Sequence, residues 1–192
     1  MFENSFFKSL HHAAFQVSSV MTTTGFATTD FDLWPHLSRG VLMVLMVLGA
    51  SAGSTGGGIK TARVVLLLKK LRLELQKLLR PRSVRVLQFN GTPVTTAVMD
   101  GVTVYMAAYC FIGVLSFLLI SIDNFSLETN LSAMLACFNN IGPGLGMVGP
   151  VRSYAGYSDL SKLVLSLDML LGRLEIFPIL ALLSPHSWSR KA

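Results

Sequence analysis

Long apolar stretches alternate with short polar ones along most of the 192-residue chain. A helix rises about 1.5 Å per residue, so it needs about 20 residues to cross roughly 30 Å of hydrocarbon. The stretch 102–122 is apolar and uncharged, and it predicts a membrane-spanning helix. The stretch 160–183 predicts a second spanning helix, although Lys162, Asp168, Arg173 and Glu175 interrupt its apolar pattern.

A third spanning helix is predicted in two pieces. Residues 35–50 are apolar but too few to cross alone, and a run of serine, threonine and glycine follows before a helical pattern resumes at Ile59. We expect one long helix that glycines break inside the membrane and that continues as a basic cytoplasmic helix. An unwound backbone at that depth must face water or protein, and such broken helices are typical of transport proteins.

Two shorter segments resemble each other. Residues 4–21 and 127–138 both have a helical pattern, and each ends in a polar, glycine-containing turn, Thr22–Phe26 and Asn139–Pro143. A polar linker and then a predicted spanning helix follow each turn. The repeat predicts an all-α integral membrane fold with about three transmembrane helices and two re-entrant pore loops.

Composition supports a membrane protein. The chain is 52% hydrophobic and 14% charged, with a mean hydropathy of +0.57, whereas soluble domains carry about 25% charged residues. Cys110 and Cys137 lie in apolar segments and are expected to be buried thiols, because no cysteine framework is present.

The net charge of +6 is unevenly placed, because nine basic side chains lie between Lys60 and Arg85. Flanked by predicted spans, this stretch indicates a cytoplasmic loop and not a nucleic-acid site. Its helical part, 69–80, is suited either to a regulatory partner or to anionic lipid. The two loops then face outside with the acidic residues Asp30, Asp32, Asp123, Glu128 and Asp159. These acids either raise the local cation concentration or are ordinary solvated side chains.

The loop turns suit a permeating cation. A cation that gives up its water needs oxygen ligands, commonly rings of backbone carbonyls, and glycine gives a filter backbone the necessary freedom. A short helix whose C-terminus faces the cation adds a partial negative charge. Each turn has one central glycine, Gly25 or Gly142, where the well-known potassium-channel filter has two. We therefore expect a shorter filter that discriminates less against sodium.

Four motifs occur in an order that resembles the C-terminal part of the Trk/Ktr/HKT superfamily of potassium transporters, in particular the bacterial TrkH type. The motifs are Thr22-Thr23-Thr24-Gly25-Phe26, Gly53-Ser54-Thr55-Gly56-Gly57-Gly58-Ile59-Lys60, Asn140-Ile141-Gly142-Pro143-Gly144-Leu145-Gly146 and Gly172-Arg173-Leu174-Glu175. The resemblance covers nearly the whole chain.

The resemblance implies a bacterial inner-membrane, multi-pass protein in which four pseudo-repeats surround one pore. It implies K⁺ as the transported ion, no covalent cofactor and no enzymatic activity. The implied third filter segment, with its K⁺ ligands, is Thr23, Thr24 and Gly25 followed by Phe26; the fourth is Asn140, Ile141 and Gly142 followed by Pro143. The implied gating loop contains Gly53, Ser54, Thr55, Gly56, Gly57, Gly58 and Lys60, and Arg173 is implied to project toward the pore.

The resemblance also divides the chain. Residues 1–85 correspond to a third repeat that lacks its first helix, and 86–192 to a fourth repeat. We therefore expect a fragment with about half of a four-repeat pore, which would need a second copy or the missing repeats. The family forms homodimers and has a cytosolic nucleotide-binding regulator of the TrkA type. The alternative is a truncated membrane subunit that does not conduct.

Two residue sets have competing interpretations. Arg173 either contributes to a barrier below the filter or forms a structural ion pair with Glu175, Asp168 or Asp100. The stretch Gly53–Thr61 also resembles the phosphate-binding loop of a nucleotide-binding ATPase. That motif requires glycine, four residues and then Gly-Lys-Ser/Thr, but Ile59 separates Gly58 from Lys60.

Overall fold

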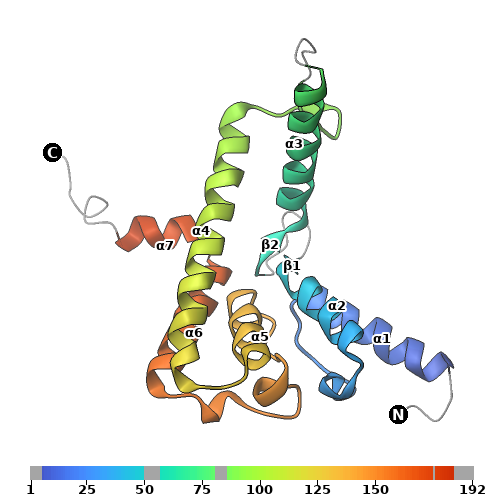
Figure 1. Cartoon of the computed structure of the whole chain (residues 1–192), viewed down its shortest axis with the longest axis vertical. Coiled ribbons are helices and arrows are strands. Elements are labelled where there is room, and N and C mark those ends of the chain that lie inside the picture. The colour runs from blue at the N-terminus through green and yellow to red at the C-terminus, as the bar shows by residue number, and fades with distance from the viewer. Residues whose placement is uncertain (1–5, 50–56, 81–85, 175, 184–192) are drawn as a thin grey trace.

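The computed structural model describes residues 6–49, 57–80, 86–174 and 176–183, and its regular structure is mostly helical. Figure 1 shows a long helix, α4, with two shorter helices packed against its lower half and a separate pair leading away from them. The helices are α1 (Phe6–Met21), α2 (His36–Val47), α3 (Thr61–Leu79), α4 (Thr96–Ile120), α5 (Leu127–Phe138), α6 (Asp159–Arg173) and α7 (Ile176–Leu183).

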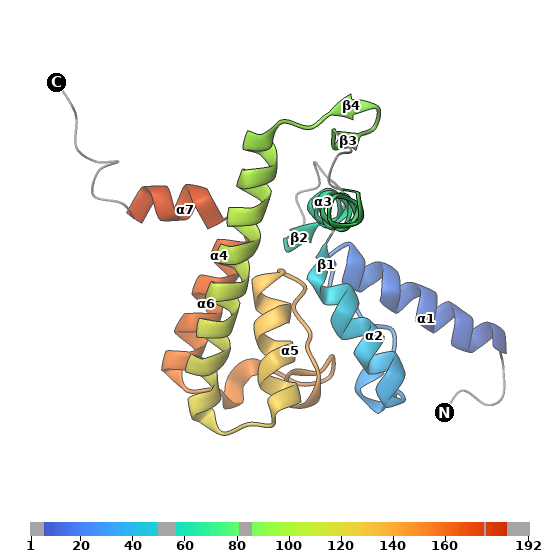
Figure 2. The ribbon, with the colours of Figure 1, turned by 45° about the horizontal axis from the view of Figure 1, so that its top comes forward.

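Short elements connect these helices. The 3₁₀ turns are η1 (Phe31–Leu33), η2 (Ser121–Asp123), η3 (Gly146–Val148) and η4 (Tyr154–Gly156). Strands β1 (Leu48–Gly49) and β2 (Ile59–Lys60) pair in parallel, and β3 (Gln88–Phe89) and β4 (Thr92–Pro93) form an antiparallel hairpin. Figure 2 shows this hairpin connecting the outer ends of α3 and α4.

Helix α5 is the centre of the core. Nine of its 12 residues are buried, and it packs against α2, α4 and α6. Its N-terminus is capped by Ser126, whose hydroxyl accepts from the backbone N–H of Thr129, and Ser158 caps α6 in the same way through Ser161. The observed bounds of α5 are those that the apolar pattern predicts.

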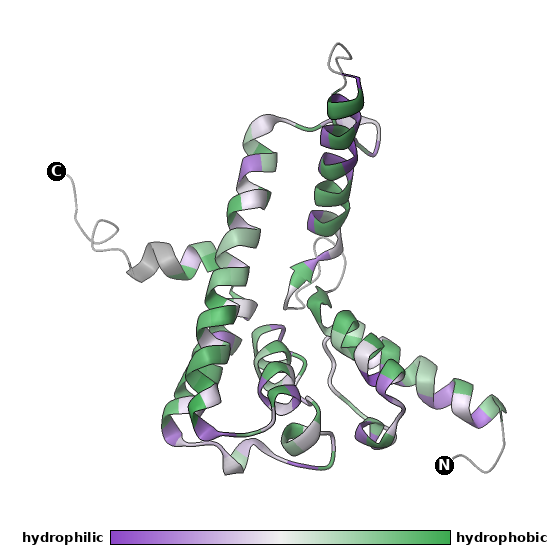
Figure 3. Cartoon of the chain, in the orientation of Figure 1, coloured by the Kyte–Doolittle hydropathy of each residue, from purple (hydrophilic) through white to green (hydrophobic). Residues whose placement is uncertain are grey.

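One helix of the described residues is long and apolar enough to cross a membrane, namely α4 with its continuation to Asp123. Figure 3 shows hydrophobic residues over most of α4, whereas hydrophilic residues gather on α3 and in the linkers. Helix α2 is apolar but shorter. The basic helix α3 packs on the outer part of α4 through a small cluster of Leu66, Met99 and Val102.

The predicted continuous helix over 160–183 is divided in two. Helix α6 ends at Arg173, and α7 begins at Ile176 and runs away from the bundle in both views. Pro178 gives the physical reason, because in a continuous helix its ring would clash with the carbonyl of Leu174. The break places Pro178 in the first turn of α7, where proline is tolerated.

The predicted glycine-broken helix is likewise two helices, with a change of direction between α2 and α3. Leu48 pairs with Ile59 and Gly49 with Lys60, so the two ends of the intervening loop lie side by side. The Thr61 hydroxyl adds a 3.0 Å hydrogen bond to the Gly49 carbonyl. Residues 50–56, including Gly53, Ser54, Thr55 and Gly56, lie outside the described residues.

Candidate ion-conducting site

The two glycine-containing turns, here the first loop (Thr22–Phe26) and the second loop (Asn139–Pro143), have a positive φ at the same two positions. Thr23 and Asn140 both lie in the left-handed region, at φ 55° and 56°, and so do Gly25 and Gly142, at φ 77° and 107°. Left-handed backbone is uncommon for residues with a side chain. The paired φ values therefore indicate that the same kind of turn occurs at both places.

Hydrogen bonds at the two helix ends match as well. In the first loop the N–H of Thr24 donates to Ser19 O at 2.9 Å and that of Thr23 to Val20 O at 3.2 Å. In the second, Ile141 donates to Ala136 O at 2.8 Å and Asn140 to Cys137 O at 3.0 Å. This is the Schellman arrangement, with Thr23 and Asn140 as the left-handed residues. Each loop position thus has a counterpart 117 residues later in the chain.

The two loops contact each other directly. A β-carbon added to Gly25 would lie 2.0 Å from the Ile141 carbonyl oxygen and 3.2 Å from Pro143 Cδ. The Ile141 carbonyl is therefore directed toward the first loop, and Gly25 has both a steric and a conformational reason to be glycine. At Gly142 an added β-carbon would meet nothing within 4 Å, so only its positive φ favours glycine there.

Hydroxyl groups hold one carbonyl in each loop. The Ser19 hydroxyl donates to Phe26 O at 2.6 Å, and the Tyr154 hydroxyl donates to Gly142 O at 2.7 Å. The neighbouring Tyr157 donates to Asn130 Oδ1 at 2.8 Å. Burial raises the pKa of Tyr157 to about 12, so this phenol keeps its proton and its donor role at neutral pH.

The described end of the glycine loop packs beneath the second loop. A β-carbon on Gly57 would lie 2.5 Å from Asn139 O, and one on Gly58 would lie 2.6 Å from Asn139 Oδ1. Asn139 is fully buried, and its Oδ1 also accepts a 2.8 Å hydrogen bond from Tyr109 on α4. Lys60 follows in β2 and is half-buried. The structure therefore brings the described end of the predicted gating loop, Gly57 and Gly58, against the end of α5.

The end of α6 meets the same place from another side. A β-carbon on Gly172 would lie 1.7 Å from Phe138 O, and Asn140 Nδ2 donates to Met169 O at 2.9 Å. Arg173 is the next residue, at the C-terminal end of α6, and is exposed. Its proposed ion-pair partner Glu175 lies outside the described residues, and Asp168 instead accepts a 2.6 Å hydrogen bond from Ser116.

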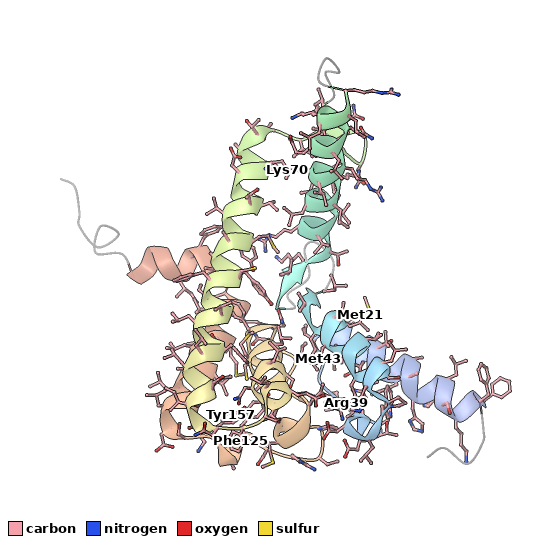
Figure 4. The ribbon with its side chains drawn as sticks, in the orientation of Figure 1. Met21, Arg39, Met43, Lys70, Phe125 and Tyr157 are labelled. Atoms are coloured by element: carbon pink, nitrogen blue, oxygen red, sulfur yellow. The ribbon has the colours of Figure 1, made fainter. Side chains whose placement is uncertain are left out.

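Acidic residues of the outer linkers have structural partners. Arg39, labelled in Figure 4, forms a bidentate pair with Glu128, and Asp32 Oδ1 accepts from the N–H of Gly146 at 2.9 Å. Asp123 accepts from the N–H of Ser158 at 2.9 Å. Three of the five acids therefore join separate segments of the chain, so neither a purely solvated role nor an acidic mouth describes them fully.

Several contacts of this site were not predicted from the sequence. Tyr109, Tyr154 and the Arg39–Glu128 pair bind partners that are 12 to 89 residues away in the sequence. Their only signal was a polar group in or beside an apolar stretch. Within the described ranges, no group of three or more His, Cys, Asp or Glu side chains is placed to hold a metal ion.

The family model described as TrkH, a cation transport protein, matches residues 6–190. The chain belongs to the TrkH family. It is therefore related to membrane transport proteins and not to enzymes, and the ATPase interpretation of the glycine loop has no support from its relatives.

Individual relatives agree with this membership. The Trk system potassium uptake protein TrkH of Vibrio parahaemolyticus is 37% identical over 182 residues, which are 95% of this chain and 37% of that protein. TrkG of Escherichia coli K12 is 33% identical over 180 residues, 94% of this chain and 37% of its own. The crystal structure of the potassium transporter TrkH from Vibrio parahaemolyticus matches with a TM-score of 0.87 at 37% identity, over 97% of this chain and 39% of that one. The TrkH-family chain thus spans little more than a third of the length of these relatives.

Proposed function

We propose that this chain contributes two of four filter segments to a potassium-uptake pore in the bacterial inner membrane. The first loop supplies the third segment, with K⁺ ligands among Thr23, Thr24 and Gly25, and the second loop supplies the fourth, with ligands among Asn140, Ile141 and Gly142. The observation that carries the proposal is the contact of Gly25 with the Ile141 carbonyl, between two turns of matched conformation.

Electrostatics supports a cation at this place. Helices α1 and α5 both end at the loops, and the C-terminal end of a helix carries a partial negative charge. Both helices have an uncharged last turn, since neither contains a basic residue there. Carbonyl oxygens of the turns can then replace the water of a permeating K⁺.

The remaining parts follow from the same proposal. Residues 1–85 form a third repeat that lacks its first helix, and 86–192 form a fourth. Helix α4 is one of about three spans, and α2 with α3 and α6 with α7 form the other two. Gly53–Lys60 gates the pore beneath the filter, with Arg173 as a nearby positive charge. A second copy or further repeats close the pore, and α3 offers its basic surface to a nucleotide-binding regulator or to lipid. Transport needs no hydrolysis at the pore, because moving one charge inward across 100 mV gains about 2.3 kcal/mol.

The test is growth on low potassium of bacteria that lack their own uptake systems and express the full chain. Gly25→Ala places a methyl group into the Ile141 carbonyl and should abolish rescue. The matched control is Gly40→Ala on α2, where an added β-carbon meets nothing within 4 Å. Rescue that survives Gly25→Ala would refute the filter assignment. Absence of rescue by the unaltered chain, despite insertion in the membrane, would favour a subunit that does not conduct.

A further inference from the structure

The two loops orient their carbonyls by different means. In the first loop the hydroxyl of Ser19, within α1 itself, holds Phe26 O. The counterpart of Ser19 in α5 is Ala136, because each accepts the same backbone hydrogen bond from its loop. Alanine has no hydroxyl to donate. The second loop therefore lacks this internal donor. Instead Tyr154, in the following linker, holds the carbonyl one position earlier, Gly142 O, at 2.7 Å, and the counterpart of that carbonyl in the first loop is Gly25 O.

Tyr154 is held firmly in place. Its ring stacks on Tyr157, with centroids 6.2 Å apart and an interplanar angle of 27°. Tyr157 in turn packs edge-on against Phe125 at 4.8 Å and is anchored to the buried Asn130 of α5. Figure 4 shows Phe125 and Tyr157 together near the base of α4. The phenol that reaches Gly142 is thus fixed to the same helix that leads into the second loop.

Successive carbonyls of the second loop then point in different directions. The Ile141 oxygen is directed at Gly25 of the first loop, whereas the Gly142 oxygen is bonded to Tyr154. Tyr154 lines a cavity of about 280 Å³ between α5 and α6, together with Cys137, Gly142 and Leu165. Because Gly142 itself lines this cavity, the peptide after it has room to rotate when its hydrogen bond is removed.

We infer that Tyr154 is a positioning residue that decides which carbonyl oxygens of the fourth filter segment are available to the ion, and that it thereby sets discrimination between K⁺ and Na⁺. The inference rests on the proposed function. Selectivity depends on the number and placement of coordinating carbonyls. Tyr154 keeps the Gly142 oxygen turned toward the cavity. The carbonyl oxygens of the second loop that can bind the ion are then those of the preceding residues, Asn140 and Ile141.

The experiment is cation flux into liposomes that contain the full chain, measured for K⁺ and Na⁺ with Tyr154→Phe. This change removes one oxygen and keeps the ring stack on Tyr157. A hydrogen bond contributes about 1 kcal/mol, so the K⁺ to Na⁺ flux ratio should fall roughly fivefold while K⁺ flux persists. The matched control is Tyr157→Phe, which breaks the Asn130 bond but leaves the Tyr154 hydroxyl. It should change the ratio less. An unchanged ratio in Tyr154→Phe, or equal changes in both variants, would overturn the inference.

A second measurement separates this inference from the proposed function. Cys137 is 6% exposed and lines the same cavity. In a Cys110→Ser background, Tyr154→Phe should speed labelling of Cys137 by a small thiol reagent several-fold, whether or not the chain conducts. If the unaltered chain passes no K⁺, the proposed function fails, and the labelling still tests whether the Tyr154 hydroxyl holds the Gly142 carbonyl in place. Labelling of Cys137 at the unaltered rate would overturn it.

Discussion

Gly172 of α6 lies directly against the carbonyl group of Phe138, so that a β-carbon at residue 172 would be only 1.7 Å from that oxygen. The contact joins the last turn of α6 to the last residue of α5, immediately before the second loop. Helix α6 could not approach the loop with any side chain at this position. The close approach also lets Asn140 Nδ2 reach the Met169 carbonyl.

Gly172→Ala should therefore destabilise the chain, by about 1–3 kcal/mol as for other overpacked sites. The obstructing atom is backbone, so it cannot rotate away. Thermal unfolding in detergent, followed by circular dichroism, measures the loss. Gly101→Ala is the matched control, because Gly101 lies within α4 with nothing within 4 Å of an added β-carbon. That control should be neutral or slightly stabilising, since alanine favours helix over glycine. Equal midpoints for the two variants would contradict the contact.

The Arg39–Glu128 pair should hold the two halves of the chain together on the predicted outer side. Arg39 belongs to α2 and Glu128 to α5, and both oxygens of the carboxylate accept from the same guanidinium nitrogen. Glu128 is 38% exposed, so solvent screens the pair, and we expect Arg39→Ala to cost only about 1 kcal/mol. The measurement is the unfolding midpoint at low and high salt.

Charge reversal separates the ion pair from simple packing. Arg39→Glu alone should destabilise more than Arg39→Ala, because Asp32 also lies 4.0 Å from the guanidinium. Combining it with Glu128→Arg should restore part of the loss. A double variant no more stable than Arg39→Glu would show that the side chains contribute by packing alone.

Local patterns predicted the helices and the two turns well. The bounds of α5 follow from its apolar run between Ser126 and Asn139, and the repeat of short helix and glycine turn appears in the structure as one Schellman ending used twice. These features depend on neighbours in the sequence, so spacing alone reveals them. The division of α6 from α7 also has a local cause, Pro178. The prediction of one continuous helix was wrong because it followed the apolar run and did not take this proline into account.

Contacts between distant segments were not predictable in the same way. Nothing in the sequence near Gly142 indicates that Tyr154 donates to its carbonyl, nor near Gly172 that Phe138 is its neighbour. Both depend on how α5 and α6 pack. The acids Asp32 and Glu128 were predicted as outward-facing, but their internal partners Gly146 and Arg39 come from the other loop region.

The buried hydrogen bond between Tyr109 and Asn139 should stabilise the junction of α4, α5 and the glycine loop. Tyr109 stacks on Phe138 with centroids 4.6 Å apart, and its hydroxyl satisfies Asn139 Oδ1 beside Gly58. Tyr109→Phe keeps the stack but leaves a buried oxygen unpaired, which costs about 1–3 kcal/mol. Chemical unfolding in detergent measures this loss. If the midpoint does not move, a water molecule or another donor satisfies the oxygen in place of the phenol.

Arg173 should act on permeation and not on folding. It is exposed at the end of α6, one residue after the contact of Gly172 with Phe138. Two unit charges about 10 Å apart repel by about 1.7 kcal/mol at an effective dielectric constant of about 20. If Arg173 lowers K⁺ flux by such repulsion, Arg173→Ala should raise the flux on the order of tenfold and leave the unfolding midpoint in place. Arg173→Lys keeps the charge and should retain the low flux. A variant Arg173→Ala that loses stability without gaining flux would instead identify a structural arginine.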